Sequence, residues 1–293
     1  MPQPVRWLLR EVRAVNSETP TPSVDLTPGV ASALSPLVRR IVAPNPSLMT
    51  GPGTNTYLVG IDEVAVIDPG PDDAEHIRSI IGASMEDRIR WVLLTHTHPD
   101  HAPGAEAIRK ATGAEVLAFS KKNDYVDIDG TLGDGAVVEG TEFGLEVIHT
   151  PGHADDHICF LLEEERALFS GDHIMQGTTV VVSDMAAYMA SLERLKKLRR
   201  ISRILPAHGE VIDDFKGTVE QYLEHRTMRE KQILKALKGG PAKIEEIVQR
   251  IYAGEIPEGL MDMAARQVHA HLVKLKGEGK VSGRDARSTW KTA

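Results

Sequence analysis

Hydrophobic residues in the first 214 positions gather in short runs that polar segments separate. The runs rich in Val, Ile and Leu predict strands at 38–44, 55–60, 63–70, 89–94, 115–119, 143–149, 158–163, 166–170, 178–183 and 203–209. Apolar positions at helical spacing between these runs predict helices at 73–82, 102–113 and 185–200. Strands that alternate with helices predict an α/β fold built from layers.

The pattern changes after Gly217. Helical spacing predicts helices at 219–238, 242–252 and 260–276, followed by a hairpin at 279–291. Three helices and a β-ribbon are typical of a winged helix. A plain helical cap that packs on the main domain or forms a homodimer is as well supported as a role in binding nucleic acid. We therefore divide the chain into an irregular lead-in at 1–37, a main α/β domain at 38–214 and a winged-helix-like domain at 215–293.

Charge is distributed unevenly along the chain, whose formal net charge is −8. Residues 1–214 hold 19 Lys and Arg against 32 Asp and Glu, whereas residues 215–293 hold 15 against 10. This asymmetry supports a separate C-terminal unit. This unit offers six cations that could contact a phosphate backbone: Lys274, Lys276, Lys280, Arg284, Arg287 and Lys291. Trp290, which lies among them, could stack on a base. A solvated charged face is the simpler alternative.

Cys159 is the only cysteine, which excludes an intrachain disulfide and a four-cysteine zinc site. A reducing compartment is therefore favoured, and we expect a cytoplasmic protein. No segment approaches the roughly 18 consecutive apolar residues of a membrane helix, so we expect no membrane association. Charged residues interrupt positions 1–15, which argues against a secretory signal.

Potential metal ligands follow four predicted strands. His96, His98, Asp100 and His101 lie in "THTHPDH", and the two-residue spacing of the first pair points both rings to one side of an extended segment. His153, Asp172 and His208 each follow another apolar run and are flanked by Gly or Pro. We expect His96, His98 and His153 to hold one metal ion, and Asp100, His101 and His208 a second. Asp172 would bridge the two ions.

Nitrogen and carboxylate ligands without thiolate suit Zn²⁺, with Mn²⁺ or Fe²⁺ as alternatives. Two adjacent cations lower the pKa of a bridging water to about 7, so the expected nucleophile is a metal-bridging hydroxide. Asp100 and Asp172 are the candidate catalytic carboxylates, and Asp100 would also orient the hydroxide. Asp68 is a candidate for holding a ligating imidazole, with a turn cap before Pro69 as the alternative.

Several other residues favour structural roles. We expect His157 to be an ordinary histidine at a strand edge, and His173 to turn away from the metals. Cys159 is expected in the core. The loop with Thr54 and Asn55 borders the site, and Met185 and Tyr188 are expected to pack in the core rather than line an entrance.

The motif of His96, His98, Asp100 and His101 resembles the H-x-H-x-D-H motif of the metallo-β-lactamase superfamily, and His153, Asp172 and His208 match its later ligands. The resemblance covers about residues 38–214 and implies a four-layer αββα sandwich with a two-metal catalytic site. Asp172 stands where lactamases with a mixed site use cysteine. That departure favours the hydroxyacylglutathione hydrolase, lactonase and nuclease branches over the true lactamases.

Four stretches, 45–60, 150–172, 177–195 and 225–234, are similar to the β-lactamase-like protein 2 group, which has a C-terminal winged helix. Its mitochondrial member is an endoribonuclease selective for single strands, and its fungal relatives are thioesterases. The resemblance thus implies a zinc-dependent hydrolase, with single-stranded RNA as the favoured substrate. A thioesterase or another acyl-ester or lactone hydrolase of the glyoxalase II type is the alternative. Two further alternatives are a β-lactamase-like side activity and a binding protein that a metal ion stabilises.

Overall fold

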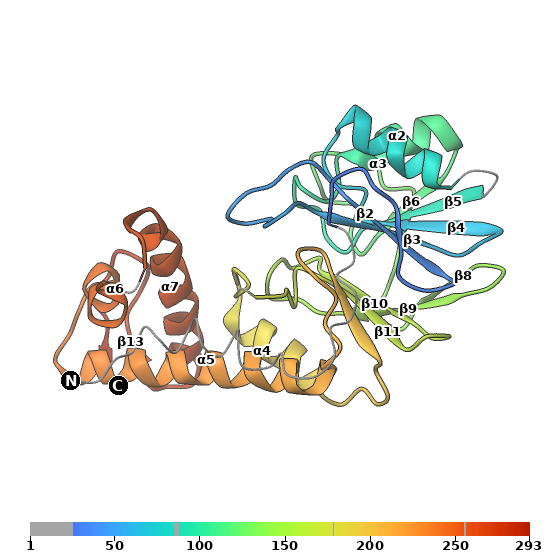
Figure 1. The fold of residues 1–293 in the computed structure, drawn as a ribbon. Coiled ribbons are helices and arrows are strands. Elements are labelled where there is room, and N and C mark those ends of the chain that lie inside the picture. The colour runs from blue at the N-terminus through green and yellow to red at the C-terminus, as the bar shows by residue number, and fades with distance from the viewer. Residues whose placement is uncertain (1–25, 85–87, 178, 255) are drawn as a thin grey trace, which may run out of the picture. The chain divides into compact units, whose positions relative to one another are not determined.

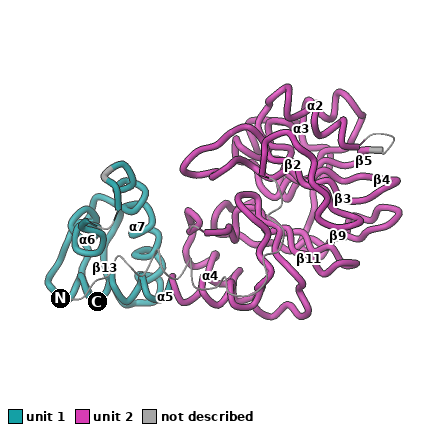
Figure 2. The backbone as a smooth tube through the Cα atoms, viewed as in Figure 1, with its two compact units in different colours: residues 1–23, 226–293 teal, residues 24–225 magenta. Residues whose placement is uncertain are grey.

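The computed structural model describes residues 26–84, 88–177, 179–254 and 256–293. The described chain forms two compact units, a larger one up to His225 and a smaller one from Arg226 to Ala293 (Figure 2). Most of the predicted lead-in lies outside the described residues. None of the described helices is both long and apolar enough to cross a membrane.

The first sheet of the larger unit has seven strands in the order of the chain. They are β1 (Ser32–Ala33), β2 (Val38–Val42), β3 (Asn55–Val59), β4 (Glu63–Ile67), β5 (Arg88–Leu93), β6 (Glu115–Ala118) and β7 (Gly130–Thr131). The pairs from β1 to β4 are antiparallel, and those from β4 to β7 are parallel. The strand β1 lies inside the segment that the sequence predicted to be irregular.

The second sheet has five strands in the order β12-β11-β10-β9-β8. They are β8 (Val137–Glu139), β9 (Gly144–His149), β10 (Ile158–Leu162), β11 (Ala167–Gly171) and β12 (Arg203–Pro206). Only the β11–β12 pair is parallel, and its register shifts between Phe169 and Gly171. This irregularity lies directly before Asp172.

The two sheets pack face to face, and helices cover their outer faces (Figure 1). On one side lie α2 (Ala74–Ala83) and α3 (Gly104–Thr112), and on the other lies α4 (Met185–Leu195). Tyr57 and Phe169 meet edge to face between the sheets, with ring centroids 5.1 Å apart. The strands β4, β10 and β11 are buried almost throughout and contain continuous apolar runs, as strands covered on both faces do. The αββα prediction is confirmed.

One predicted strand is wrong. The segment 178–183 has the apolar pattern of a strand, but residues 179–183 belong to neither sheet. Val180 and Val182 are buried, whereas the backbone bonds to the loop that carries His153: Ser183 N–H donates to Gly152 O, and Val181 O accepts from the His153 ring. Alternating burial thus arises here from packing against a loop rather than from a ladder.

The smaller unit contains the end of α5 (Phe215–Lys238), then α6 (Ile244–Tyr252), η1 (Glu258–Leu260), α7 (Met261–Gly277), β13 (Val281–Ser282) and β14 (Lys291–Thr292). Its core joins the helices and the ribbon through Ile247, Val268, Leu272 and Trp290, all fully buried. This arrangement confirms the predicted winged helix. Trp290, which the sequence offered for stacking on a base, is instead a core residue and cannot reach a ligand. The expectation failed because the ribbon turns this ring inward.

Candidate metal centre

The seven predicted ligands converge at one edge of the two sheets, where four strands end. His96 and His98 follow β5, and His153 follows β9. Asp172 comes directly after β11, and His208 comes two residues after β12. Loops beyond strand ends are the usual location of sites in α/β folds. The sandwich therefore brings together residues that are 112 positions apart in the chain.

A first group consists of three imidazoles. His98 Nδ1 lies 2.9 Å from His96 Nε2 and 2.9 Å from His153 Nε2. All three nitrogens lie within 4.8 Å of one another, and His96 and His153 are buried. Three converging imidazole nitrogens are a ligand set typical of zinc.

A second group consists of Asp100, His101 and His208. Asp100 Oδ2 lies 3.3 Å from His208 Nε2 and 3.6 Å from His101 Nε2. Asp172 lies between the groups. One of its oxygens, Oδ1, is 3.2 Å from His208 Nε2, and the other, Oδ2, is 3.5 Å from His153 Nε2. The carboxylate thus faces both groups at once.

The donors fit divalent cations. Among the described residues, His101 Nε2 and Asp172 Oδ1 are buried without a hydrogen-bond partner, although they lie only 3.5 Å apart. Buried polar atoms are normally satisfied, so a pair left open in this way calls for a shared partner. Nitrogen and carboxylate oxygen together favour a borderline metal ion such as Zn²⁺.

The ring nitrogens behind the site have partners that set the tautomer of each histidine. His96 Nδ1 lies 3.0 Å from Thr95 Oγ1, and His101 Nδ1 lies 2.9 Å from Asp68 Oδ2. His153 Nδ1–H donates to Val181 O at 2.7 Å, and His208 Nδ1–H donates to Gly53 O at 3.3 Å. With the proton held on Nδ1, the neutral form of each of the four rings has an unprotonated Nε2, the form that binds a metal.

Asp68 is the main carboxylate in this supporting layer. Its Oδ1 accepts the Thr95 backbone N–H at 2.8 Å, and its Oδ2 accepts both the Thr95 hydroxyl at 2.7 Å and the His101 ring. Its backbone has a φ of 49°, a left-handed conformation that is uncommon outside glycine. The contact with His101 agrees with the role that the sequence predicted for Asp68.

The electrostatics of the two groups differ. Burial, and then the neighbouring imidazoles, hold the pKa of His96 well below 6.5, and burial likewise lowers the pKa of His98. Burial opposes protonation of His101 and His208 too, but the surrounding carboxylates outweigh it and raise their pKa values to about 9 and about 10. The second group therefore lies in a field that favours positive charge, as a cation site requires.

The loop between β2 and β3 borders the second group, as predicted. Thr54 forms an isolated bridge with His208, and the Asn55 side chain donates to Pro206 O and Gly209 O. Gly53 is required here, because its φ is 143° and a Cβ would lie 2.0 Å from Ala43 O. The loop is thus closely fitted to the strand end that carries His208.

Other predicted residues lie where a structural role would place them. Cys159 is fully buried, and burial raises the pKa of its thiol to about 12, so it is no nucleophile. Met185 and Tyr188 are also buried. The rings of His173 and Tyr188 pack together with centroids 4.6 Å apart, and His173 belongs to none of the ligand groups.

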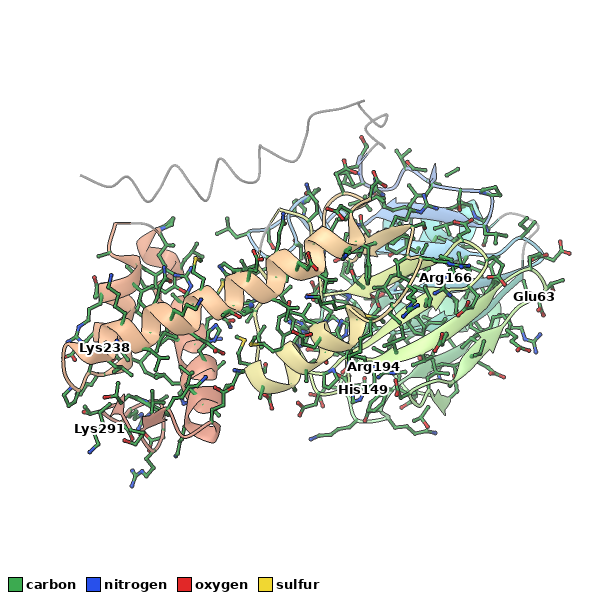
Figure 3. The ribbon with its side chains drawn as sticks, turned by 90° about the horizontal axis from the view of Figure 1, so that it is seen from below. Glu63, His149, Arg166, Arg194, Lys238 and Lys291 are labelled. Carbon is green, nitrogen blue, oxygen red and sulfur yellow. The ribbon has the colours of Figure 1, made fainter. Side chains whose placement is uncertain are left out.

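Several supporting contacts have no clear signal in the sequence. Thr97 Oγ1–H donates to Asp156 Oδ2 at 2.7 Å and so ties the loop of His96 and His98 to the loop of His153. Arg194 of α4 donates to His149 O at the end of β9 and to Asp134 (Figure 3). A Thr between two candidate ligands was the only available hint of the first contact.

An αββα sandwich with this His and Asp arrangement at its edge defines a metallohydrolase of the lactamase-like class. The chain matches the model of the metallo-β-lactamase superfamily over residues 49–208, and that of the β-lactamase-associated winged helix domain over residues 244–290. It belongs to the metallo-β-lactamase superfamily.

More particularly, the chain is 36% identical over 276 residues to a β-lactamase-like protein 2 homolog of Drosophila melanogaster, covering 87% of this chain and 93% of that protein. It is 32% identical over 265 residues to an atrochrysone carboxyl ACP thioesterase of Claviceps purpurea, covering 85% of this chain and 83% of the relative. A metallo-β-lactamase family protein from Thermus thermophilus has the same fold, with a TM-score of 0.75 at 23% identity over 89% of this chain and 100% of its own.

Proposed function

We propose that the chain is a hydrolase that holds two divalent cations, with His96, His98 and His153 on one ion and Asp100, His101 and His208 on the other. The observation that carries this proposal is the position of Asp172, whose two oxygens face the two groups. Zn²⁺ is the favoured ion, with Mn²⁺ or Fe²⁺ as alternatives. When bound, such cations polarise a substrate oxygen and activate water at neutral pH.

The two carboxylates have different parts in the proposal. The Asp172 side chain is 10% exposed, which suits a residue that holds both ions in place. The Asp100 side chain is 27% exposed, so a water molecule at the mouth of the site can reach it. We assign Asp100 the task of accepting a hydrogen bond from the attacking water and fixing its direction. No serine or cysteine nucleophile is needed.

An acyl thioester is the substrate class that the surroundings of the site support best. The ligand-bearing loops at 95–104, 150–157, 172–177 and 207–211 contain five Asp and Glu residues but no Lys or Arg. A phosphate backbone is held mainly by Lys and Arg, and these loops offer none. Thioesters carry no such charge at the reacting carbon, and relatives with similar coverage are named as thioesterases.

The loop between β2 and β3 adds an apolar surface beside these acidic loops. Its tip exposes Leu48 by 88% and Met49 by 46%, and its base pairs with His208. The Ser47 hydroxyl accepts the N–H groups of Met49 and Thr50, so the tip has a defined shape. A preformed apolar tip, on the loop whose base bridges to His208, suits the acyl chain of a substrate.

Single-stranded RNA, the substrate that the sequence favoured, remains the second candidate because of the smaller unit. Of its candidate cations, Lys274, Lys280 and Arg284 are paired with Glu230, Glu278 and Asp285. The other three candidate cations, Lys276, Arg287 and Lys291, are exposed and have no carboxylate partner among the described residues; Lys291 is labelled in Figure 3. Exposed cations without a carboxylate partner support weak, salt-dependent binding of a phosphate backbone.

The test is one panel of substrates offered to the metal-loaded protein: a medium-chain acyl-CoA, a single-stranded RNA, a lactone and a cephalosporin. We expect thioester cleavage to be fastest, and expect His96→Ala and Asp172→Ala to abolish it while metal content falls. His269→Ala, a half-buried histidine of the smaller unit, is the control and should keep activity and metal.

Full activity with unchanged metal content in both site variants would refute the metal-dependent mechanism. RNA cleavage that exceeds thioester cleavage, and that Lys276→Glu with Lys291→Glu reduces, would establish the second candidate instead. The same double variant should leave thioester cleavage unchanged.

A further inference from the structure

His157, which the sequence suggested to be an ordinary histidine at a strand edge, lies fully buried directly before β10. Both of its ring nitrogens have partners. Nε2 accepts the backbone N–H of Asp172 at 3.1 Å, and Nδ1 lies 2.9 Å from the Thr150 hydroxyl. Because Nε2 accepts, the ring proton is on Nδ1 and is donated to Thr150. His157 therefore belongs to none of the ligand groups but touches the backbone of the shared carboxylate.

The backbone at Asp172 needs such a partner. The β11–β12 ladder shifts register between Phe169 and Gly171, so the chain leaves the regular strand just before Asp172. Gly171 has a φ of 50°, and a Cβ at this position would lie 2.7 Å from His157 Nε2 and 2.7 Å from Thr95 Oγ1. A buried backbone N–H beyond the end of a ladder has to find another acceptor. The His157 ring supplies it.

We propose that His157 is a positioning residue that, together with Thr150, sets the direction of the Asp172 carboxylate toward both cations. The proposal rests on the proposed two-cation function. The Thr150 hydroxyl accepts from Nδ1–H of His157 and so favours the tautomer with an unprotonated Nε2. That Nε2 can then accept the Asp172 N–H. The hydrogen bond from the Asp172 N–H fixes the backbone conformation at Asp172, and with it the direction of the carboxylate. Groups that orient ligands from behind commonly change metal affinity by about 10- to 100-fold when they are altered.

Matched variants separate this role from simple packing. Thr150→Val keeps the shape but removes the acceptor for Nδ1–H, whereas Thr150→Ser keeps the hydroxyl. Loss of the acceptor leaves the buried Nδ1–H of His157 unsatisfied, which weakens the preference for the tautomer whose Nε2 accepts the Asp172 N–H. At the ring itself, His157→Leu removes the acceptor, and His157→Gln offers a carbonyl oxygen in a similar place.

The readouts are the two Zn²⁺ dissociation constants and the absorption spectrum of the Co²⁺-substituted protein, with unfolding of the metal-free protein measured alongside. We expect Thr150→Val and His157→Leu to weaken one or both ions by about 10- to 100-fold and to change the Co²⁺ spectrum. Thr150→Ser and His157→Gln should stay within about threefold of the wild type.

Wild-type affinities and an unchanged Co²⁺ spectrum in folded Thr150→Val would overturn the role of His157, even where His157→Leu fails to fold. Equal losses in Thr150→Ser and Thr150→Val would overturn it as well, because the loss would then not depend on whether the hydroxyl is present. A wild-type protein that binds fewer than two ions would instead overturn the proposed function on which the role depends.

Discussion

Replacing Asp68 by Asn tests the layer of hydrogen bonds behind the metal ligands. The amide oxygen takes the place of Oδ1 and keeps the bond from the Thr95 backbone N–H. The NH₂ group then faces the His101 ring, whose Nδ1–H donates a hydrogen bond to Oδ2 at 2.9 Å in the wild type. Two donors now oppose each other unless the ring proton moves to Nε2. That nitrogen lies 3.5 Å from Asp172 Oδ1 and is the one that points into the second group.

The expected loss follows from this conflict. A hydrogen bond to a charged group contributes about 1.5–3 kcal/mol, which corresponds to a factor of roughly 10 to 100 in a dissociation constant. The ion held by Asp100, His101 and His208 should lose this affinity in full, because Asp68 contacts the His101 ring directly. The ion held by His96, His98 and His153 should lose less, because Asp68 reaches His96 only through the Thr95 hydroxyl.

The assay is a Zn²⁺ titration at pH 7 in competition with a chromophoric chelator, which resolves two binding steps. Asp73→Asn is the matched control, because it makes the same chemical change at the cap of α2, where the Asp73 carboxylate accepts the N–H groups of Glu75 and His76. Two unchanged dissociation constants in a folded Asp68→Asn protein would refute the argument that Asp68 sets the His101 tautomer.

Three further predictions concern metal, substrate and pH. Removing metal with a chelator should abolish hydrolysis and lower the melting temperature. Zn²⁺ at about 1,000 times its dissociation constant should restore about 4 kcal/mol of stability. A melting temperature that does not depend on Zn²⁺ would contradict this prediction. The double variant Leu48→Ser, Met49→Ser should raise KM for a long-chain thioester about tenfold and leave KM for a short-chain thioester unchanged. The control Ile61→Ser, at a residue that is 47% exposed and away from the metal ligands, should change neither KM value. Burial lowers the pKa of His76 to about 4, so the neutral ring is favoured in the folded state, and this stability is lost as pH falls from 6.5 to 4. The loss should reach about 3 kcal/mol in urea unfolding of the metal-free protein and be absent in His76→Gln; identical pH profiles would exclude it.

Much of the fold could be predicted because long strands and helices have a strong periodic signal. The predicted helix at 260–276 differs by one residue at each end from α7 (Met261–Gly277). Strands of two or three residues such as β7 and β8 were missed, since so short a segment has no period to detect. The segment 178–183 failed for the opposite reason, because it has the period of a strand without the ladder.

The seven ligand candidates could be chosen from the sequence because each side chain has the chemistry of a metal ligand and follows an apolar run. The groups that orient these ligands from behind could not be chosen from the sequence. His153 and His208 are oriented by the backbone carbonyls of Val181 and Gly53, and every residue has a carbonyl, so no residue type marks these positions. His157 was underrated because its partner is also a backbone group, the N–H of Asp172.

The same limit applies to substrate choice, which depends on where charges lie in space more than on which residues are present. Residues 215–293 carry a net positive charge, which was the physical support for the RNA substrate that the family resemblance favoured. In the structure, Glu230, Glu278 and Asp285 pair with several of those cations. A paired cation gains less from a phosphate, because it must first lose its carboxylate. The loops that carry the metal ligands offer a phosphate no Lys or Arg at all. A neutral acyl carbon needs only the metals and Asp100, and for that reason we place the thioester before the RNA.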